Sequence, residues 1–326
     1  MYSSYQEYFS ASSGPIEKYH SGDVKSRDKI AILEMKATIM PPFTERLLKS
    51  IKRAKEDDQV KGAVLVIDSP GGLVADSHQI YHRLQELAKQ KPIVVVMKRM
   101  AASGGYYIAM GGGSDATIYA EPTTWTGSIG VIIPRYNAAA LAQKIGIRSE
   151  PLKTGRFKDS LNPFQDLRDG ETALWRGILD DAFNRFLNVI AQNRKSIYRK
   201  KPHLHALNAS ALCLLEAQEP PQQGVAAEDV ATGQIFTANQ ALELGLVDKL
   251  GYMDDAIEEL KDRLKLKSVR VVTYQHPQTL LSMLAGMAKA QQPEHRWKMM
   301  VDATIPRAMY YCVGLPIVSG DRSWDE

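Results

Sequence analysis

Short apolar runs alternate with longer amphipathic segments over the first third of the chain. The apolar runs predict strands at residues 30–35, 62–67 and 93–98, and the segments between them predict helices at about residues 42–57 and 73–90. The runs AVLVI and IVVV are continuous rather than alternating, which is typical of strands buried on both faces of a sheet. This repeating order of strand, helix and strand predicts an α/β fold with a mostly parallel sheet.

The pattern continues with further predicted strands at residues 117–120 and 129–134, and with a long amphipathic helix at residues 169–193. We expect that helix to pack on the core or on a neighbouring subunit. Residues 195–229 are basic and then rich in proline, glutamine and alanine, which predicts an exposed insertion. Regular structure is predicted to resume with a helix that Thr237 caps and that stops at Gly245.

These patterns divide the chain into three parts. Residues 1–28 are aromatic, serine-rich and charged, and are predicted to form an N-terminal arm or linker. Residues 29–275 are predicted to form one domain that contains the insertion, and residues 276–326 a C-terminal extension. The chain shows neither an apolar run of signal-peptide length at its start nor a span of about twenty apolar residues, so no membrane crossing is expected.

Composition narrows the classes of function only slightly. The 326 residues are 44% hydrophobic, which is enough for a sizeable core. The formal net charge is +4 and the basic residues are mixed with acidic ones, so the sequence shows no extended basic surface that would bind nucleic acid. Cys213 and Cys312 match no metal-ligand spacing and are interpreted as two unrelated thiols.

The segment MAASGGYYIAM, residues 100–110, places Ser103 among small residues directly after a predicted strand. Side chains at the carboxyl end of a parallel strand lie where α/β folds bind their ligands. Ser103 could therefore be a nucleophile, or it could simply cap the helix that follows.

A nucleophilic serine needs a base, which is usually histidine. None of the seven histidines stands beside a strand end, and His78 and His82, four apart on a predicted helix, lack the glutamate of a zinc-protease motif and are interpreted as a solvated face. Lysine can replace histidine where burial lowers the pKa of its amine. The candidate is Lys158, in the turning segment KTGRFKDSLNPF, although alone it would be interpreted as a surface lysine.

Two further turns resemble parts of an active site. In IDSPGGLVAD, residues 67–76, a buried strand ends in glycines whose N–H groups suit an anionic oxygen. In PTTWTGSIGVI, residues 122–132, Ser128 is predicted to begin a strand. Each turn alone is ordinary.

Together and in this order, these segments resemble the signal peptide peptidase A group of serine proteases, peptidase family S49. The matching pieces are DSPGG, AASGGYYIA, PTTWTGSIGVI, TGRFKD and GQIFTANQALELGLVDKLG, which lie within residues 29–251. The resemblance implies a ClpP/crotonase-like fold of repeated β-β-α units, with a single catalytic domain and a helical extension. It implies the following roles: Ser103 as nucleophile, Lys158 as general base, Ser128 as the residue that orients the lysine, and the N–H groups of Gly71 or Gly72 and of Gly104 as the oxyanion hole.

The same resemblance implies partners. Apolar peptides such as cleaved signal peptides would bind as an added strand and be hydrolysed, without a cofactor or a metal. Because each motif occurs once, the chain is expected to form a homo-oligomeric ring in which the lysine of one subunit can reach the serine of the next. Association with a membrane is also implied.

Two other functions are compatible with the fold. A crotonase-like acyl-CoA enzyme would need a catalytic carboxylate and an adenine-binding surface, which these segments do not supply. A non-catalytic oligomeric scaffold would be free to lose Ser103 or Lys158, and the chain has both.

Overall fold

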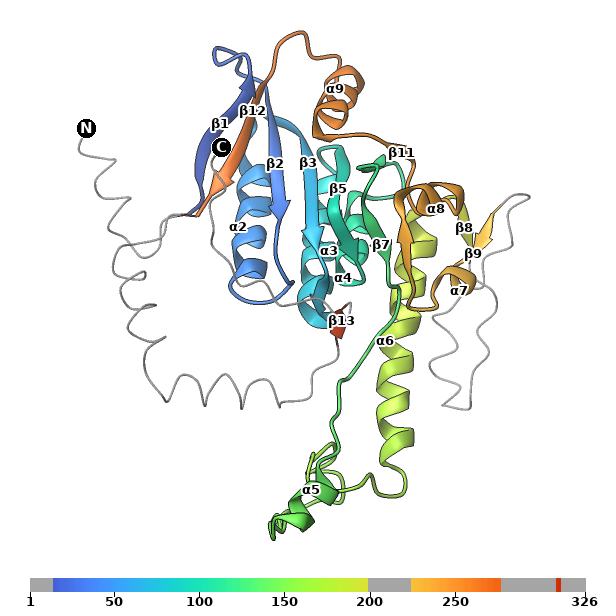
Figure 1. The fold of residues 1–326 in the computed structure, drawn as a ribbon. Helices are drawn as coiled ribbons and strands as arrows, with labels where there is room; N and C mark the ends of the chain where they lie inside the picture. The colour runs from blue at the N-terminus through green and yellow to red at the C-terminus, as the bar shows by residue number, and fades with distance from the viewer. Residues whose placement is uncertain (1–13, 199–223, 277–308, 312–326) are drawn as a thin grey trace, which may run out of the picture.

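The computed structural model describes residues 14–198, 224–276 and 309–311, and Figure 1 shows their arrangement. The main sheet has the strand order β1-β12-β2-β3-β5-β6-β11, with β7 beside β5 and β10 beside β7. Its strands are β1 (Ile16–Gly22), β2 (Lys29–Met35), β3 (Val60–Ser69), β5 (Ile93–Ala102), β6 (Ile118–Ala120), β7 (Trp125–Gly127), β10 (Ile235–Thr237), β11 (Lys249–Leu250) and β12 (Arg270–Gln275).

The centre of this sheet is parallel, as predicted. β2, β3, β5 and β6 pair in parallel, as do β5 with β7, β11 with β6 and β12 with β2, whereas β1 and β10 pair antiparallel with their neighbours. Successive residues of β3 point into two different cores, with Val64 and Val66 in one and Leu65 and Ile67 in the other. The continuous apolar runs are therefore strands covered on both faces.

Helices cover the two faces unequally. On one face lie α2 (Phe43–Glu56), α3 (Val74–Ala88), α4 (Gly104–Ala109) and part of α6 (Glu171–Asn193), and their buried side chains join those of Leu65 and Ile67. On the other face α9 (Met253–Arg263) packs Leu260 against Val64 and Val66. Among the described residues, no helix is long and apolar enough to cross a membrane.

The predicted strand at residues 129–134 is wrong. Strand β7 ends at Gly127, before Ser128, and from residues 129–134 only Ile132 forms an isolated bridge, to Met309. Ser128 has φ of 49°, which turns the chain out of the extended ladder. Ser128 thus follows a strand rather than beginning one.

Part of the predicted N-terminal arm belongs to the sheet. Residues 16–22 form β1, a largely exposed edge strand that pairs with β12. The charged and aromatic composition that suggested a linker also suits an edge strand, because such strands keep polar side chains in water.

A long excursion leaves the sheet after Ile132 and returns through α6. We call residues 133–170 the protrusion; it contains α5 (Ala139–Lys144), which lies far below the sheet in Figure 1. Its exposed large apolar side chains are Tyr136, Leu141, Ile145, Ile147, Leu152, Phe157, Phe164 and Leu167. The predicted amphipathic helix is α6, whose first half also exposes Leu174 and Ile178 while Phe186 and Ile190 are buried.

The smaller elements complete the fold. Strand β4 (Gly71–Leu73) pairs with β13 (Met309–Tyr311), and β8 (Ile197–Tyr198) pairs with β9 (Val225–Ala226) beside α7 (Ala227–Val230). A 3-10 turn, η1 (Met110–Gly112), follows α4. Thr237 caps α8 (Ala238–Glu243) in a capping box, and Gly245 follows with φ of 73°, which confirms the predicted start and stop. Cys213 and Cys312, with most of the predicted insertion, lie outside the described residues.

Candidate active site

Ser103 stands where β5 ends and α4 begins. Its φ is 53° and its ψ is −112°, a combination that residues other than glycine rarely adopt and that costs about 1–3 kcal/mol. The residue is 1% exposed, and within the described part of the chain its hydroxyl has no hydrogen-bond partner. Ser103 occupies the N-cap position of α4 but makes no capping hydrogen bond through its side chain. Helix capping therefore does not explain the serine.

Ser128 lies next to Ser103 across two paired strands. Ala102 of β5 is in register with Gly127 of β7, and each serine is the residue that follows. Ser128 also has a positive φ, is 8% exposed, and donates its backbone N–H to the carbonyl oxygen of Gln234 at 2.6 Å. Parallel pairing thus brings the two serines to the same edge of the sheet.

The glycines of the DSPGG turn lie against the residue after Ser103. A β-carbon added to Gly104 would stand 3.1 Å from the nitrogen of Gly72 and 3.1 Å from the α-carbon of Gly71. The N–H of Gly71 donates to the hydroxyl oxygen of Ser69 at 3.2 Å. These contacts bring two backbone segments, the glycine turn and the start of α4, together beside Ser103, and only glycine permits such close approach.

Lys158 is not brought to Ser103 within the chain. It lies in the protrusion with an exposed side chain, in a turn where its N–H donates to the carbonyl oxygen of Gly155 at 3.2 Å. Ser103 is buried, and no hydrogen bond connects the two residues in the described part of the chain. Five of the six predicted site residues therefore gather at the sheet edge, and the sixth lies apart from them.

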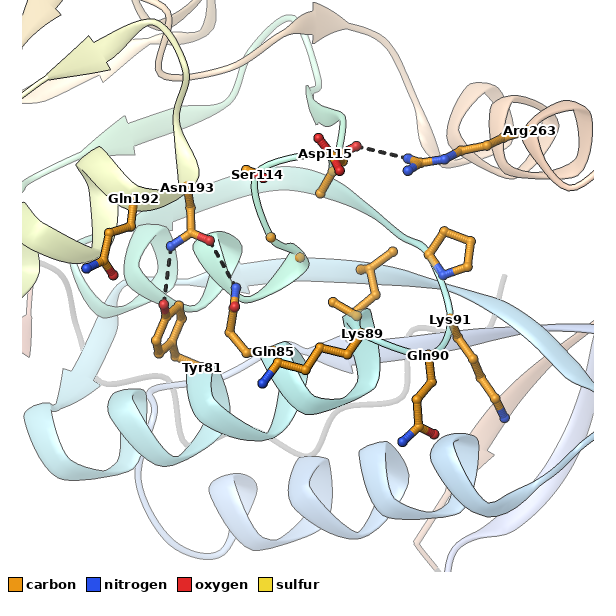
Figure 2. Close-up of a pocket in the computed structure, with 16 residues that line it drawn as sticks. Tyr81, Gln85, Lys89, Gln90, Lys91, Ser114, Asp115, Gln192, Asn193 and Arg263 are labelled. Atoms are coloured by element: carbon orange, nitrogen blue, oxygen red, sulfur yellow. Dashed lines mark hydrogen bonds between the residues drawn. The ribbon is translucent and has the colours of Figure 1, made fainter. Parts of the chain in front are cut away.

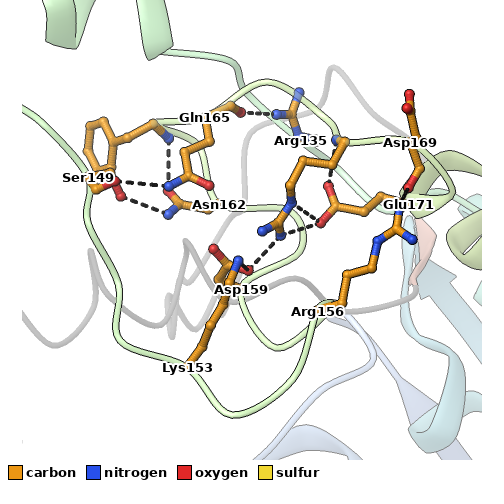
Figure 3. Close-up of polar contacts among 11 residues, drawn as sticks. Arg135, Ser149, Lys153, Arg156, Asp159, Asn162, Gln165, Asp169 and Glu171 are labelled. Carbon is orange, nitrogen blue, oxygen red and sulfur yellow. Dashed lines mark hydrogen bonds and ion pairs between the residues drawn. The ribbon is translucent and has the colours of Figure 1, made fainter.

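An ionic cluster holds the turn that carries Lys158 (Figure 3). Asp159, the next residue, pairs with Arg168 at 2.5 Å and with Lys153 at 2.6 Å. Arg168 also pairs with Glu171, whose side chain is 2% exposed at the start of α6. The hydrogen bonds from Arg168 and then Lys153 lower the pKa of Asp159 to about 2. The lysine thus stands on a locally fixed loop rather than on a free chain.

The two histidines of α3, His78 and His82, lie in different environments. His82 is exposed and lies 3.3 Å from Glu86, as a solvated face requires. His78 is half-buried, and its Nδ1 lies 2.7 Å from the hydroxyl of Tyr107, so the solvated-face interpretation is wrong for this residue. Burial lowers the pKa of His78, with Arg185 and His82 adding to the effect. No group of histidine, cysteine, aspartate and glutamate among the described residues could hold a metal.

The sequence analysis missed the strand that lies beside the predicted oxyanion glycines. Met309 and Tyr310 of β13 pair with Leu73 and Gly72 of β4. This strand has only three residues and lies in a segment of mixed apolar and basic composition. Hydrophobic periodicity can be recognised only over a longer window, so no pattern in the sequence marks the strand.

A pocket of about 470 Å³ lies elsewhere on the molecule (Figure 2). Its walls come from the end of α3, the start of β5, residues 112–116 and the end of α6. Asn193 is one of the lining residues. Its side-chain nitrogen donates to the hydroxyl of Tyr81, and its side-chain oxygen accepts a hydrogen bond from the side chain of Gln85. None of the predicted site residues lines this pocket.

Comparison with known proteins identifies relatives over most of the chain. A family model described as "Peptidase family S49" matches residues 85–204 and 223–267. "Putative signal peptide peptidase SppA" of Enterococcus faecium is 34% identical over 72% of this chain and 60% of its own length. "Putative protease slr0021" of Synechocystis sp. is 32% identical over 80% of this chain and 84% of its own length. The chain therefore spans less than two thirds of the Enterococcus relative.

Among solved structures, a mutant of a membrane-bound stomatin-specific protease aligns with a TM-score of 0.45 and 16% identity. The alignment covers 78% of this chain and all of the other. A likeness of this size does not by itself establish a common fold. The strand pairing of the chain itself defines the mostly parallel sheet.

Proposed function

This chain belongs to peptidase family S49, and we propose that it is a serine endopeptidase in which Ser103 attacks the peptide bond and Lys158 is the base. The observation that carries the proposal is the state of Ser103. Its backbone is strained and its buried hydroxyl has no partner in the described part of the chain, two features that each cost stability. Backbone strain of this kind clusters at active sites, and a catalytic role accounts for a buried hydroxyl that has no structural partner.

The chemistry assigned to the site is acyl transfer. The neutral amine of Lys158 accepts the hydroxyl proton of Ser103 while the serine oxygen bonds to the substrate carbonyl carbon. The lysine then gives that proton to the departing amine as the peptide bond breaks, and water hydrolyses the acyl-enzyme by the same route. Because the N–H of Gly71 already donates to Ser69, the N–H groups of Gly72 and Gly104 are the better pair of oxyanion donors.

The separation of the two residues in one chain supports a dyad shared between chains. The protrusion carries Lys158 away from the sheet and exposes many apolar side chains, among them Leu141 and Ile147. Apolar surface of this kind marks interaction sites in soluble proteins. We assign it to contact with a second copy of this chain, whose Ser103 would receive the lysine. In that assembly Ser128, beside Ser103, would accept or donate a hydrogen bond that orients the amine.

The proposed substrates are apolar peptides, including cleaved signal peptides, bound as an added strand beside β4. Association with a membrane is a proposal that rests on the family resemblance alone. The relative from Enterococcus faecium has a name that includes signal peptide peptidase, which is consistent with this class of substrate.

The test is labelling with a fluorophosphonate, followed by peptide mapping. The expected result is a single adduct on Ser103, with no adduct in Ser103→Ala and much slower labelling in Lys158→Ala. Ser77 is the matched control, since it is also buried but its hydroxyl donates to the carbonyl oxygen of Leu73 at 2.9 Å. Absence of labelling at Ser103 in folded, assembled protein would favour a non-catalytic scaffold.

A further inference from the structure

Thr126 of strand β7 has a completely buried side chain that bonds to the neighbouring strand. It is 0% exposed, and its hydroxyl donates to the carbonyl oxygen of Ala101 in β5 at 2.7 Å. The sulfur of Met97 lies 3.6 Å from the same hydroxyl and is the weaker acceptor. Burying a hydroxyl costs free energy that valine, the same shape without the hydroxyl, would avoid. The bond to Ala101 therefore calls for an explanation beyond packing.

This bond stands just before two strained residues. Ala101 and Thr126 are a register pair of β5 and β7, Ser103 is two residues after Ala101, and Ser128 is two residues after Thr126. The φ angles of the two serines are 53° and 49°. Strained conformations of this kind persist only where the surrounding structure fixes them. The Thr126 hydroxyl is a side-chain contribution to that fixing.

Two hydrogen bonds between the strands enclose the last register pair before the serines. The first is the bond from the Thr126 hydroxyl to Ala101, and the second runs from the N–H of Ser103 to the carbonyl oxygen of Gly127 at 2.8 Å. Between them lies the pair of Ala102 and Gly127. Loss of the first bond would leave this pair held from one side only by backbone contacts.

Thr124 offers a matched comparison on the same chain. It is also 0% exposed, and its hydroxyl donates to the carbonyl oxygen of Met97 in β5 at 2.9 Å, with that of Lys98 also within hydrogen-bond distance. Both carbonyls lie further from Ser103 along β5 than the carbonyl of Ala101 does. Thr124 thus shares the residue type, the burial and the kind of bond, but not the position beside the serines.

We propose that Thr126 is a positioning residue, whose hydroxyl fixes Ser103 and Ser128 relative to each other by holding the backbone of β5. It acts through Ala101 rather than on the reacting atoms. The catalytic consequence rests on the proposed function, since it takes Ser103 to be the nucleophile. The placement itself is a property of two strands and can be measured without a substrate.

The first measurement is hydrogen exchange of backbone amides in the full chain, followed by mass spectrometry. In Thr126→Val the amides of Ser103 and Ser128, which donate to Gly127 and Gln234, should exchange at least about tenfold faster than in the unaltered protein. Thr126→Ser keeps the hydroxyl and should exchange like the unaltered protein. Thr124→Val should lower the melting temperature by a similar few degrees without faster exchange at the two serines.

The second measurement is steady-state hydrolysis of an apolar fluorogenic peptide. Thr126→Val should lower kcat by at least about tenfold and change KM by less than about twofold, because small displacements of reacting groups reduce the rate more than the binding. Thr126→Ser should retain kcat within about threefold, and Thr124→Val within about twofold. Thr126→Val combined with Ser128→Ala should cost less than the product of the two separate losses, since Thr126 acts partly by placing Ser128.

Three results would overturn the proposal: exchange at Ser103 no faster in Thr126→Val than in Thr124→Val, an unchanged kcat in Thr126→Val, or losses that multiply in the combination with Ser128→Ala. If Thr126→Val lowers the melting temperature severely, Thr126→Ala is the second variant without the hydroxyl. Failure of the proposed function would be seen differently, as full activity in Ser103→Ala. In that case the exchange comparison still decides whether Thr126 holds the two serines in place.

Discussion

The backbone N–H of Ser103 donates a hydrogen bond to the carbonyl oxygen of Gly127 at 2.8 Å. This bond lies one step beyond the register pair of Ala102 and Gly127, so it extends the ladder of β5 and β7 past the ordinary end of β5. The ladder holds Ser103 in its strained conformation and keeps Ser128, the next residue after Gly127, at its side. The position of the predicted nucleophile is thus a property of two paired strands.

Two substitutions of Ser103 should separate the stability cost of its backbone conformation from the loss of catalysis. Glycine tolerates a φ of 53° and alanine does not, so Ser103→Gly should be more stable than Ser103→Ala by about 1 kcal/mol, or about 2–4 °C in melting temperature. Neither variant should hydrolyse peptides. Calorimetry of both variants checks the stability, and equal melting temperatures would show that the site relaxes without cost.

Loss of Ser103 and loss of Lys158 should lower activity to the same extent, because the proposed dyad works only when both residues are present. Ser103→Ala and Lys158→Ala should each lower kcat/KM by at least about a thousandfold, and the double variant should be no worse than either alone. Ser128→Ala should cost at most about a hundredfold, since it removes an orienting group. Steady-state hydrolysis of an apolar fluorogenic peptide measures all four variants, and additive losses from Ser103 and Lys158 would contradict a dyad.

Mixed assemblies should recover activity. If Lys158 of one chain serves Ser103 of another, a Ser103→Ala chain paired with a Lys158→Ala chain recreates some complete sites. The two variants are co-expressed with different tags, and only assemblies that carry both tags are assayed. Partial activity is expected, with assemblies of each variant alone as controls. Confirmed mixed assemblies that stay inactive would mean that the dyad forms within one chain.

Activity should rise with pH. A lysine serves as a general base only in its neutral form, so kcat/KM should increase from neutral into mildly alkaline solution rather than level off below neutral pH, as a histidine base would give. The pH profile of kcat/KM checks this, with the melting temperature followed at each pH to exclude unfolding. A profile already flat between pH 5 and 7 would argue against an amine base.

The ion pairs of Asp159, the residue after Lys158, should persist into acidic solution. Asp159 has a pKa of about 2 in the fold, below its ordinary value of 3.8, mainly through Arg168 and then Lys153. A depressed pKa means that the ion pairs stabilise the loop above the ordinary value and are lost as pH falls toward 2. Carboxyl NMR titration should show this pKa, and Arg168→Gln should raise it more than Lys153→Gln. Equal shifts in the two variants would contradict the assigned order of contributions.

The sequence by itself determined the parallel sheet and most of the candidate site. Buried strands such as residues 62–67 identify themselves because every side chain must be apolar, and the order of strands and helices then restricts the sheet to parallel pairing. Ser103 could be singled out from local sequence, because it stands among small residues directly after a buried strand, whereas the roles of Gly71, Gly72 and Gly104 came from the family resemblance. The helix start at Thr237 was predictable because a cap is a local interaction.

Only the tertiary structure decided which of these turns meet and what lies against them. The ladder between β5 and β7 placed Ser128 beside Ser103 and ended the strand before residue 129, a result of pairing that local propensity does not contain. The family resemblance made Lys158 a site residue, yet in the tertiary structure it is exposed on the protrusion and has no hydrogen bond to the buried Ser103. Tyr310 lies more than two hundred residues from Tyr107 and meets it through strand pairing and burial, and contacts at that separation leave no local pattern to read.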